Sequence, residues 1–207
     1  MAISVCGLIL AAGESQRMGS PKQLLPWYGL TLLEVMIAKL LPLPLSRILV
    51  VIGHEAEQIR QQIRLNDSRV EWLVHSGYRE GQATSLRIGL ETALVSHTGV
   101  LVNLGDLPLL RAETMHAIYQ RGQAKLAEAN RPFAIQPVCR EGPGHPVFFG
   151  HVSQQMCQSL QGDEGGKGWL WQFCEVERLP VDDDGIRFDV DTPERFAAAL
   201  AMAAGDT

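Results

Sequence analysis

The chain has 207 residues, of which 46% are hydrophobic and 20% charged, proportions that are ordinary for a globular protein. Its formal net charge of −5 argues against a broad nucleic-acid-binding surface, because such surfaces are usually basic; a local basic pocket is still allowed. The apolar run at residues 6–10 is too short for a signal peptide or a membrane span. We therefore expect a cytoplasmic protein that binds neither nucleic acid nor membrane.

Apolar runs alternate with helical patterns along the chain, which predicts an α/β domain with a largely parallel sheet. Thr31 and Glu34 have the spacing of a capping box at the start of the first expected helix. No repeat or linker divides the chain, so we expect one domain over residues 1–207. The expected strands are residues 5–10, 48–52, 70–74, 100–104, 133–139, 146–149, 176–181 and 186–190, and the expected helices are 31–41, 55–63, 83–95, 112–129, 152–160, 167–173 and a last one from 192.

The segment that follows the first expected strand, LAAGESQRMGSPK from Leu10 to Lys22, has the composition of an anion-binding loop. Small residues let the backbone approach a ligand closely, and successive N–H groups form a concave site for anions. Ser15, Arg17 and Lys22 add a hydroxyl group and two positive charges. We therefore expect the loop to hold the triphosphate of a nucleotide, and an ordinary strand-to-helix turn with solvated charges is the alternative. The Walker loop, the dinucleotide fingerprint and the hydrolase nucleophile elbow do not match this stretch.

Asp106 directly follows the expected strand at residues 100–104, at the sheet edge where α/β domains bind their ligands. A carboxylate beside a polyphosphate would repel it unless a cation lies between them. Mg²⁺ fills this role because it needs few protein oxygens and takes its other ligands from phosphates and water. We expect Asp106 to bind the metal, and the alternative is that it caps the turn before Pro108.

A second carboxylate comes from Asp189 or Asp191, close to the start of the last helix. A solvated turn at 182–185 leads to the expected strand at residues 186–190. Because side chains alternate along a strand, Asp189 and Asp191 should point in opposite directions. Helix capping before Pro193 explains one of them. We favour Asp191 over Asp189 as the second metal ligand.

Three further segments are candidates for ligand contact. Gly81, Gln82 and Ser85 open the helix after the third expected strand, where they are suited to reading a base edge or binding a phosphate, or form only a capped loop. His145 begins an expected strand, and Lys167 is the cation of a glycine-rich stretch at residues 162–168. We expect His145 to contact a substrate, and the alternative is a structural histidine. We expect Lys167 to contact the second substrate, and the alternative is a plain loop.

Taken together, these motifs make the chain resemble the nucleotidyltransferases that join molybdopterin to a nucleotide, in particular the molybdenum cofactor cytidylyltransferase family. The likeness extends over nearly the whole chain in the expected order. The residues that carry it are Leu10-Ala11-Ala12-Gly13, Ser15, Arg17-Met18-Gly19, Lys22, Gly81-Gln82, Ser85-Leu86, Gly105-Asp106, Pro108-Leu109, Gly144-His145-Pro146, Gly162-Asp163, Gly165, Asp189 and Asp191-Thr192-Pro193-Glu194.

The resemblance implies a Rossmann-like three-layer domain with a mixed, mainly parallel sheet, of the nucleotide-diphospho-sugar transferase type. It implies Mg²⁺-dependent transfer of CMP from CTP to a molybdopterin-type cofactor, with apo-molybdoenzymes as further partners. Ala11-Ala12 stands where related guanylyltransferases carry a glycine-rich turn, which favours CTP by family association. Lys167 stands where members often have Arg, and it keeps the charge without the planar fork.

The expected chemistry is attack of a terminal phosphate oxygen on the α-phosphorus of the nucleotide. Because the nucleophile is already anionic, the catalytic task falls on charges that align and neutralise phosphates, for which Lys22, Arg17 and Asp106 are the candidates. Three alternatives stay open. They are transfer of a guanylyl group or transfer to a sugar or polyol phosphate, NAD(P)H-dependent oxidoreduction on the same scaffold, and a non-catalytic carrier of cofactor to molybdoenzymes.

Overall fold

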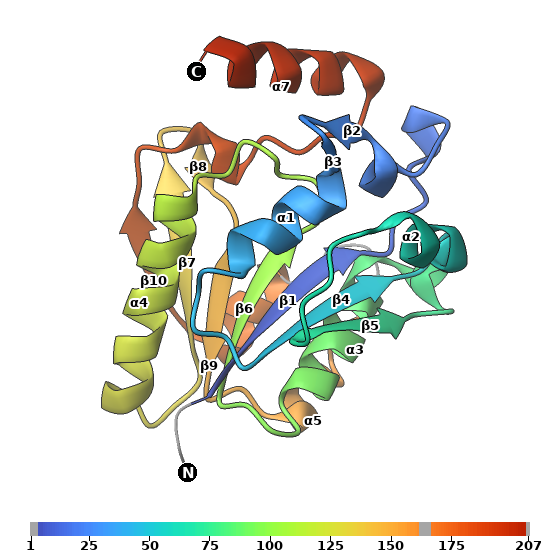
Figure 1. Cartoon of the computed structure of the whole chain (residues 1–207). Coiled ribbons are helices and arrows are strands. Elements are labelled where there is room, and N and C mark those ends of the chain that lie inside the picture. Colours follow the sequence, from blue (N-terminus) through green and yellow to red (C-terminus); the bar gives the residue numbers. More distant parts are fainter. Residues whose placement is uncertain (1–3, 162–166, 206–207) are drawn as a thin grey trace.

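A mixed, mainly parallel sheet forms the centre of the computed structural model, which describes residues 4–161 and 167–205 (Figure 1). Its strand order is β10-β7-β9-β6-β1-β4-β5, with β8 paired to β7. β9 runs antiparallel to both β6 and β7, whereas the pairs around β1 and the β10–β7 pair are parallel. The predicted fold class is therefore confirmed. The bounds are β1 Val5–Ala11, β4 Arg47–Ile52, β5 Val70–Val74, β6 Gly99–Leu104, β7 Phe133–Cys139, β8 Gly142–Pro143, β9 Val147–Gly150 and β10 Glu175–Pro180.

Helices cover both faces of the sheet and make it the middle of three layers (Figure 1). Because side chains alternate along a strand, β1 directs Val5 and Ile9 into the core under α1 and α4, and Cys6 and Leu8 into the core under α3 and α5. Both sets are almost completely buried. The helices are α1 Leu32–Leu40, α2 Ala56–Gln62, α3 Gln82–Ala93, α4 Ala112–Glu128, α5 Gln154–Cys157, α6 Lys167–Phe173 and α7 Pro193–Gly205.

Local signals in the sequence fix the start of α1. The Thr31 hydroxyl accepts a hydrogen bond from the Glu34 N–H (3.3 Å), and the Glu34 carboxylate accepts one from the Thr31 N–H (2.8 Å). This reciprocal pair is the predicted capping box. A short hairpin of β2 (Pro26–Trp27) and β3 (Leu30–Thr31) leads into the helix. No helix within the described ranges is long and apolar enough to span a membrane.

The C-terminal part departs from two sequence predictions. Residues 186–190 form no strand; a 3₁₀ turn at Asp184–Ile186 is followed by irregular chain. The predicted solvated turn at residues 182–185 is only partly exposed: Asp182 and Asp184 are exposed. Asp183 is 3% exposed and accepts hydrogen bonds from the Arg111 and Gly185 N–H groups, both at 3.0 Å. The carboxylate satisfies one backbone donor at the start of α4 and one in the 3₁₀ turn itself, which explains its burial.

Candidate active site

The loop after β1 is held in shape by its own side chains. Gln23, only 2% exposed, donates hydrogen bonds to the carbonyl groups of Ala11 (2.7 Å) and Gly13 (3.3 Å). The Ser15 hydroxyl donates to the Gln23 side chain and accepts a hydrogen bond from the Lys22 N–H (3.1 Å). Ser15 therefore shapes the loop, with its backbone in the left-handed region at φ 54°. Gln23 is not among the predicted site residues, and its only signal in the sequence is its position next to Lys22.

Lys22 lies between two carboxylates that come from distant parts of the chain. Its Nζ atom is 2.5 Å from Asp106 Oδ2 and 2.5 Å from Asp191 Oδ1. Arg17 Nη2 is 2.8 Å from the other oxygen of Asp191. Lys22 and Asp106 are largely buried, whereas the side chain of Arg17 is 68% exposed. The loop cations and both predicted metal ligands thus meet at the carboxyl ends of β1 and β6.

The pKa values of these groups reflect both burial and their contacts. Burial favours the neutral form of Lys22, but its contacts with Asp106 and Asp191 outweigh this effect and raise the pKa above the ordinary lysine value. Burial likewise favours the neutral form of Asp191, and hydrogen bonds and charges from Lys22 and Arg17 outweigh it and lower the pKa to about 2. Lys22 and Asp191 are therefore both ionised at neutral pH.

Asp189 lies in the same cleft as Asp191, so the prediction that the two carboxylates point in opposite directions was wrong. The reason is that the segment is irregular chain rather than a strand, so strict alternation does not apply. Asp189 Oδ1 is 3.0 Å from Arg195 Nη2 on α7. Burial and the neighbouring Asp191 carboxylate raise the pKa of Asp189.

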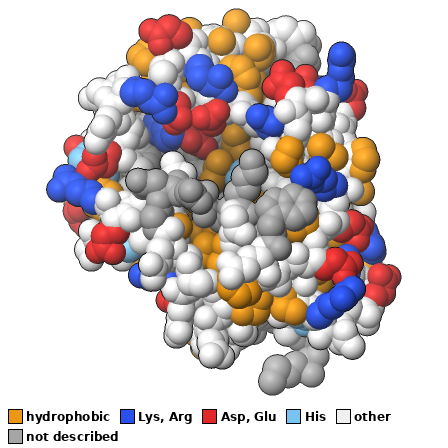
Figure 2. All heavy atoms as spheres, turned by 180° about the vertical axis from the view of Figure 1, so that it is seen from behind, with side chains coloured by type: hydrophobic (Ala, Val, Ile, Leu, Met, Phe, Trp, Pro, Cys, Tyr) orange, Lys and Arg blue, Asp and Glu red, His pale blue; other side chains and the backbone are white. Residues whose placement is uncertain are grey.

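The cleft has two adjoining lobes that share Gly13, Lys22, Gln82 and Asp191. Figure 2 shows basic and acidic side chains adjoining one another on the upper part of the face behind the view of Figure 1. The inner lobe, a cavity of about 390 Å³, is lined by Leu10–Gly13, Lys22, Gln23, Gln82, Ser85, Leu104–Leu107, Pro143–His145, Ile186, Arg187, Asp189 and Asp191. The outer lobe, about 770 Å³, is lined by Gly13–Arg17, Lys22, Tyr78–Arg79, Gly81–Gln82 and Asp191.

The start of α3 forms one wall of the cleft, and it carries the three residues predicted to contact the nucleotide. Gly81 lines the outer lobe, Ser85 the inner lobe and Gln82 both. Gly81 has φ 115°, a backbone conformation that glycine tolerates, and its carbonyl group accepts a hydrogen bond from the Thr84 hydroxyl (2.7 Å). His75 contacts the same hydroxyl at 2.9 Å, so the turn is fixed from β5. Each of the three predicted residues therefore faces the cleft.

Two buried polar atoms beside the inner lobe have no hydrogen-bond partner within the described residues, Asp106 Oδ1 and His145 Nδ1. Burial lowers the pKa of His145, although a hydrogen bond with the Val102 backbone and the charge of Asp106 oppose it. An unpaired buried polar atom costs free energy, so both atoms mark positions where a ligand improves the local bonding.

The donor set of the cleft fits a hard divalent cation that is shared with a ligand. No three His, Cys, Asp or Glu side chains in residues 4–161 and 167–205 are grouped to hold a metal by themselves. Mg²⁺ does not require such a group, since it binds through one or two carboxylates plus phosphate and water oxygens. Asp106, with one unpartnered oxygen, and Asp191 would hold it. The Lys22 ammonium group lies between these two predicted metal ligands.

One predicted contact residue cannot be placed. Lys167 is the first residue of α6, but its side chain lies outside the described part of the structure, as do residues 162–166 of the glycine-rich stretch. The other predicted residues all line one of the two lobes.

Comparison with known proteins gives consistent matches along most of the chain. A family model of the MobA-like NTP transferase domain matches residues 7–176. The chain is 26% identical over 203 residues to the molybdenum cofactor cytidylyltransferase of Escherichia coli (strain K12), with 93% of each protein covered. It is 28% identical over 207 residues to nicotine blue oxidoreductase of Paenarthrobacter nicotinovorans, covering 95% of this chain and 96% of that one.

A solved structure with the same fold is that of Rv0371C from Mycobacterium tuberculosis H37Rv in complex with manganese. It has a TM-score of 0.77 and 27% identity to this chain, and the match covers 97% of this chain and 100% of the other.

Proposed function

The chain belongs to the MobA-like NTP transferase domain family, and we propose that within it the protein transfers CMP from CTP to a molybdopterin-type cofactor and releases pyrophosphate. The observation that carries the proposal is the contact of Lys22 with Asp106 and Asp191 in a two-lobed cleft behind the loop after β1. The similarity to a molybdenum cofactor cytidylyltransferase along 93% of the chain supports this acceptor and this nucleotide.

In the proposed reaction, a terminal phosphate oxygen of the acceptor attacks the α-phosphorus of CTP. One P–O bond forms and the bond to pyrophosphate breaks; because the attacking phosphate oxygen is already anionic, no strong base is needed to deprotonate it. The obstacle is repulsion between two polyanions. Two unit charges 4 Å apart interact by about 4 kcal/mol at an effective dielectric constant near 20, whereas a helix terminus contributes about 0.3–1 kcal/mol. Side-chain charges must therefore dominate.

Lys22 and Arg17 supply those charges from the loop after β1. Both contact carboxylates, and a triphosphate in the cleft offers them stronger anionic partners. Asp106 and Asp191 would hold a divalent cation, which when bound neutralises phosphate charge and polarises the reacting group. The manganese complex of the related mycobacterial structure supports a divalent metal, and we propose Mg²⁺.

The nucleotide base is proposed to lie against the start of α3. Gln82 offers an amide group that both donates and accepts hydrogen bonds, and Ser85 offers a hydroxyl group. Leu10, Ala11, Ala12 and Gly13 supply backbone that a ligand can approach closely. The choice of CTP over GTP rests on Ala11-Ala12 and on the name of the relative.

The test is pyrophosphate release by the purified protein with CTP, GTP or ATP, each with and without the molybdopterin acceptor and Mg²⁺. The proposal expects release only with all three components, and with CTP as the preferred nucleotide. A preference for GTP would retain nucleotidyl transfer and overturn the cytidylyl assignment. Absence of release with every nucleotide would overturn the transferase itself.

A second candidate is NAD(P)H-dependent reduction of a small dye, because a relative of nearly full coverage is named nicotine blue oxidoreductase. The loop after β1 lacks the dinucleotide fingerprint, which argues against it. Oxidation of NADPH in the presence of a dye acceptor, followed by the loss of NADPH absorbance, separates the two candidates: it is expected for the oxidoreductase and not for the transferase.

A further inference from the structure

One wall of the inner lobe is built from two segments that are far apart in the sequence. The N–H of His145 donates a hydrogen bond of 2.9 Å to the carbonyl group of Ile186. A Cβ atom at Gly144 would collide with that same carbonyl oxygen, so only glycine allows the two segments to approach this closely. The backbone on either side of this contact is thereby fixed, and with it the start of the Arg187 side chain.

Arg187 is also positioned at its far end. Its Nη1 atom donates a hydrogen bond to the carbonyl group of Glu141, and it lies where a Cβ atom at Gly142 would stand. Gly142 has φ 122°, a conformation in which an L side chain is strained. Glu141 and Gly142, at the start of β8, thus hold the Arg187 guanidinium group at the edge of the inner lobe.

Arg187 differs from the other cations around the cleft in its ion pairing. Arg17, Lys22, Arg79 and Arg195 each form an ion pair with a carboxylate. Arg187 forms none within the part of the chain that the structure describes, and its one side-chain hydrogen bond there goes to an uncharged carbonyl group. Among the described residues that line the inner lobe, Lys22 and Arg187 are the cations, and Arg187 is the one that forms no ion pair with an acidic side chain.

We propose that Arg187 binds the terminal phosphate of the acceptor, with His145 beside it, and so holds the nucleophile of the transfer reaction; this rests on the proposed function. A phosphate monoester matches the planar donor fork of arginine. His145 adds a buried ring nitrogen without a partner on the same wall. Lys22 and Arg17 then serve the nucleotide and Arg187 serves the acceptor, so each polyanion has its own cation.

The variants Arg187→Ala and Arg187→Lys test this assignment, with Arg140→Ala as the matched control. Arg140 is an exposed cation just before β8 that lines neither lobe. We expect the KM for the acceptor to rise about 10- to 100-fold in Arg187→Ala, as for loss of a charge-assisted hydrogen bond. The Kd for CTP measured by calorimetry should stay within about twofold, and Arg187→Lys should recover part of the loss because it keeps only the charge.

An unchanged acceptor KM in Arg187→Ala, or an equal loss of CTP affinity, would overturn the inference while leaving the proposed function intact. If the wild type transfers no nucleotide to any acceptor, the proposed function fails, and binding of methyl phosphate followed by ³¹P line broadening still tests the site. Broadening by the wild type and by Arg140→Ala, but not by Arg187→Ala, supports an anion site at Arg187. Equal broadening by all three proteins contradicts it.

Discussion

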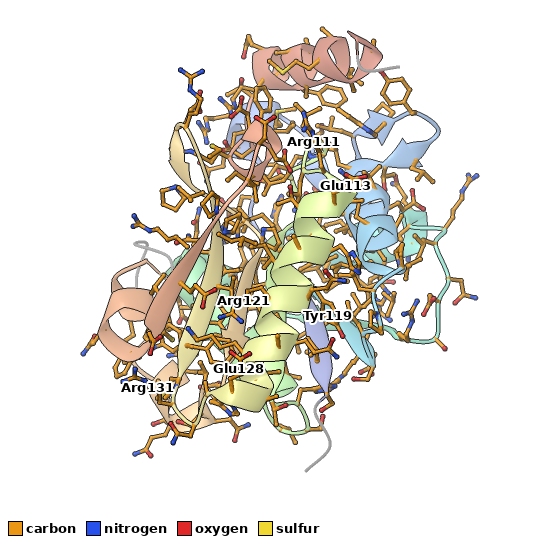
Figure 3. The ribbon with its side chains drawn as sticks, turned by 90° about the vertical axis from the view of Figure 1, so that its left-hand side faces the viewer. Arg111, Glu113, Tyr119, Arg121, Glu128 and Arg131 are labelled. Carbon is orange, nitrogen blue, oxygen red and sulfur yellow. The ribbon has the colours of Figure 1, made fainter. Side chains whose placement is uncertain are left out.

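Two charged clusters of this molecule use the same side-chain chemistry with different results. The edge cluster joins α4 and the segment after it to the edge strand β10, through Arg121, Lys125, Glu128, Arg131, Glu175 and Glu177. Figure 3 shows Arg121, Glu128 and Arg131 toward the C-terminal end of α4, on an outer side of the molecule. The cleft cluster consists of Arg17, Lys22, Asp106, Asp189 and Asp191.

The two clusters differ in how many of their polar atoms have a hydrogen-bond or ion-pair partner within the cluster. In the edge cluster, Arg121 forms two hydrogen bonds with the Glu177 carboxylate, of 2.5 and 2.9 Å, and lowers its pKa. Each cluster has one ammonium group between two carboxylates, but in the cleft cluster Asp106 also keeps a buried oxygen with no partner among the described residues. Ion pairs by themselves therefore do not mark a site; an incompletely bonded cluster in a hollow does.

The largest expected effect is on turnover, which should fall on substitution in the cleft cluster and not on substitution in the edge cluster. Asp106→Asn should lower the turnover of nucleotide transfer at least about 100-fold, because it removes charge from the reacting centre. Glu177→Gln, in the edge cluster, should leave turnover within about twofold. Pyrophosphate release measures both, and circular dichroism checks that each variant is folded. Normal transfer by Asp106→Asn would remove Asp106 from the proposed chemistry.

Lys22→Met should act in opposite directions on the two ligands of the cleft. Affinity for CTP is expected to fall about 10- to 100-fold, because a charge-assisted contact with phosphate is lost. Affinity for Mn²⁺ without nucleotide should rise, because the ammonium group no longer competes for Asp106 and Asp191. Calorimetry and the electron paramagnetic resonance signal of free Mn²⁺ give the two constants. Lys125→Met should change neither constant, and a fall of Mn²⁺ affinity in Lys22→Met would contradict the competition.

Within the edge cluster the expected effect is on stability. The Lys125 side chain is 11% exposed and contacts both Glu175 and Glu177 at 3.0 Å. Lys125→Met should lower the free energy of unfolding by about 1–2 kcal/mol, whereas Arg131→Met, at a side chain 73% exposed, should change it by less than about 0.5 kcal/mol. Urea unfolding measures both. Equal losses would show that burial does not govern this cluster.

The smallest expected effect is a pH dependence in the cleft. The pKa of Asp191 is lowered from 3.8 to about 2 in the folded state, so the ionised carboxylate stabilises the fold above about pH 4. That contribution, on the order of 1 kcal/mol, is lost as the pH falls toward 2. Asp191→Asn should thus be less stable than the wild type at pH 5, with the gap closing by pH 2. A gap that is constant over this range would contradict the assignment.

Much of the fold was predictable because its signals are local. Buried strands such as β1 and β4 read as continuous apolar runs, and Thr31 with Glu34 fixed the start of α1. The predicted strand after β10, at residues 186–190, was wrong because the conformation of this segment depends on contacts with residues far away in the sequence. Asp183 is buried to satisfy the Arg111 N–H, and Gly185 packs against the Leu109 carbonyl group. No pattern within residues 182–190 predicts those contacts.

The site was predictable where residue type and position at a strand end coincide, as for Lys22, Asp106 and Gln82. Its internal bonding was not, because the distances depend on how separate loops meet. Gln23 braces the loop after β1 through two carbonyl groups, and Arg187 reaches the lobe from irregular chain. Gln23 has only its position next to Lys22 as a signal, and nothing in the sequence around Arg187 separates it from other arginines.

The central claim is that the cleft cluster binds a nucleoside triphosphate together with a divalent cation. A ligand that binds only the folded state raises the melting temperature by mass action, so thermal unfolding with CTP, GTP, ATP or NADPH, with and without Mg²⁺, tests it directly. We expect CTP with Mg²⁺ to raise Tm most, and Lys22→Met to make the rise at the same CTP concentration much smaller. Stabilisation by NADPH alone, or a CTP effect that neither Mg²⁺ nor Lys22→Met changes, would contradict the account.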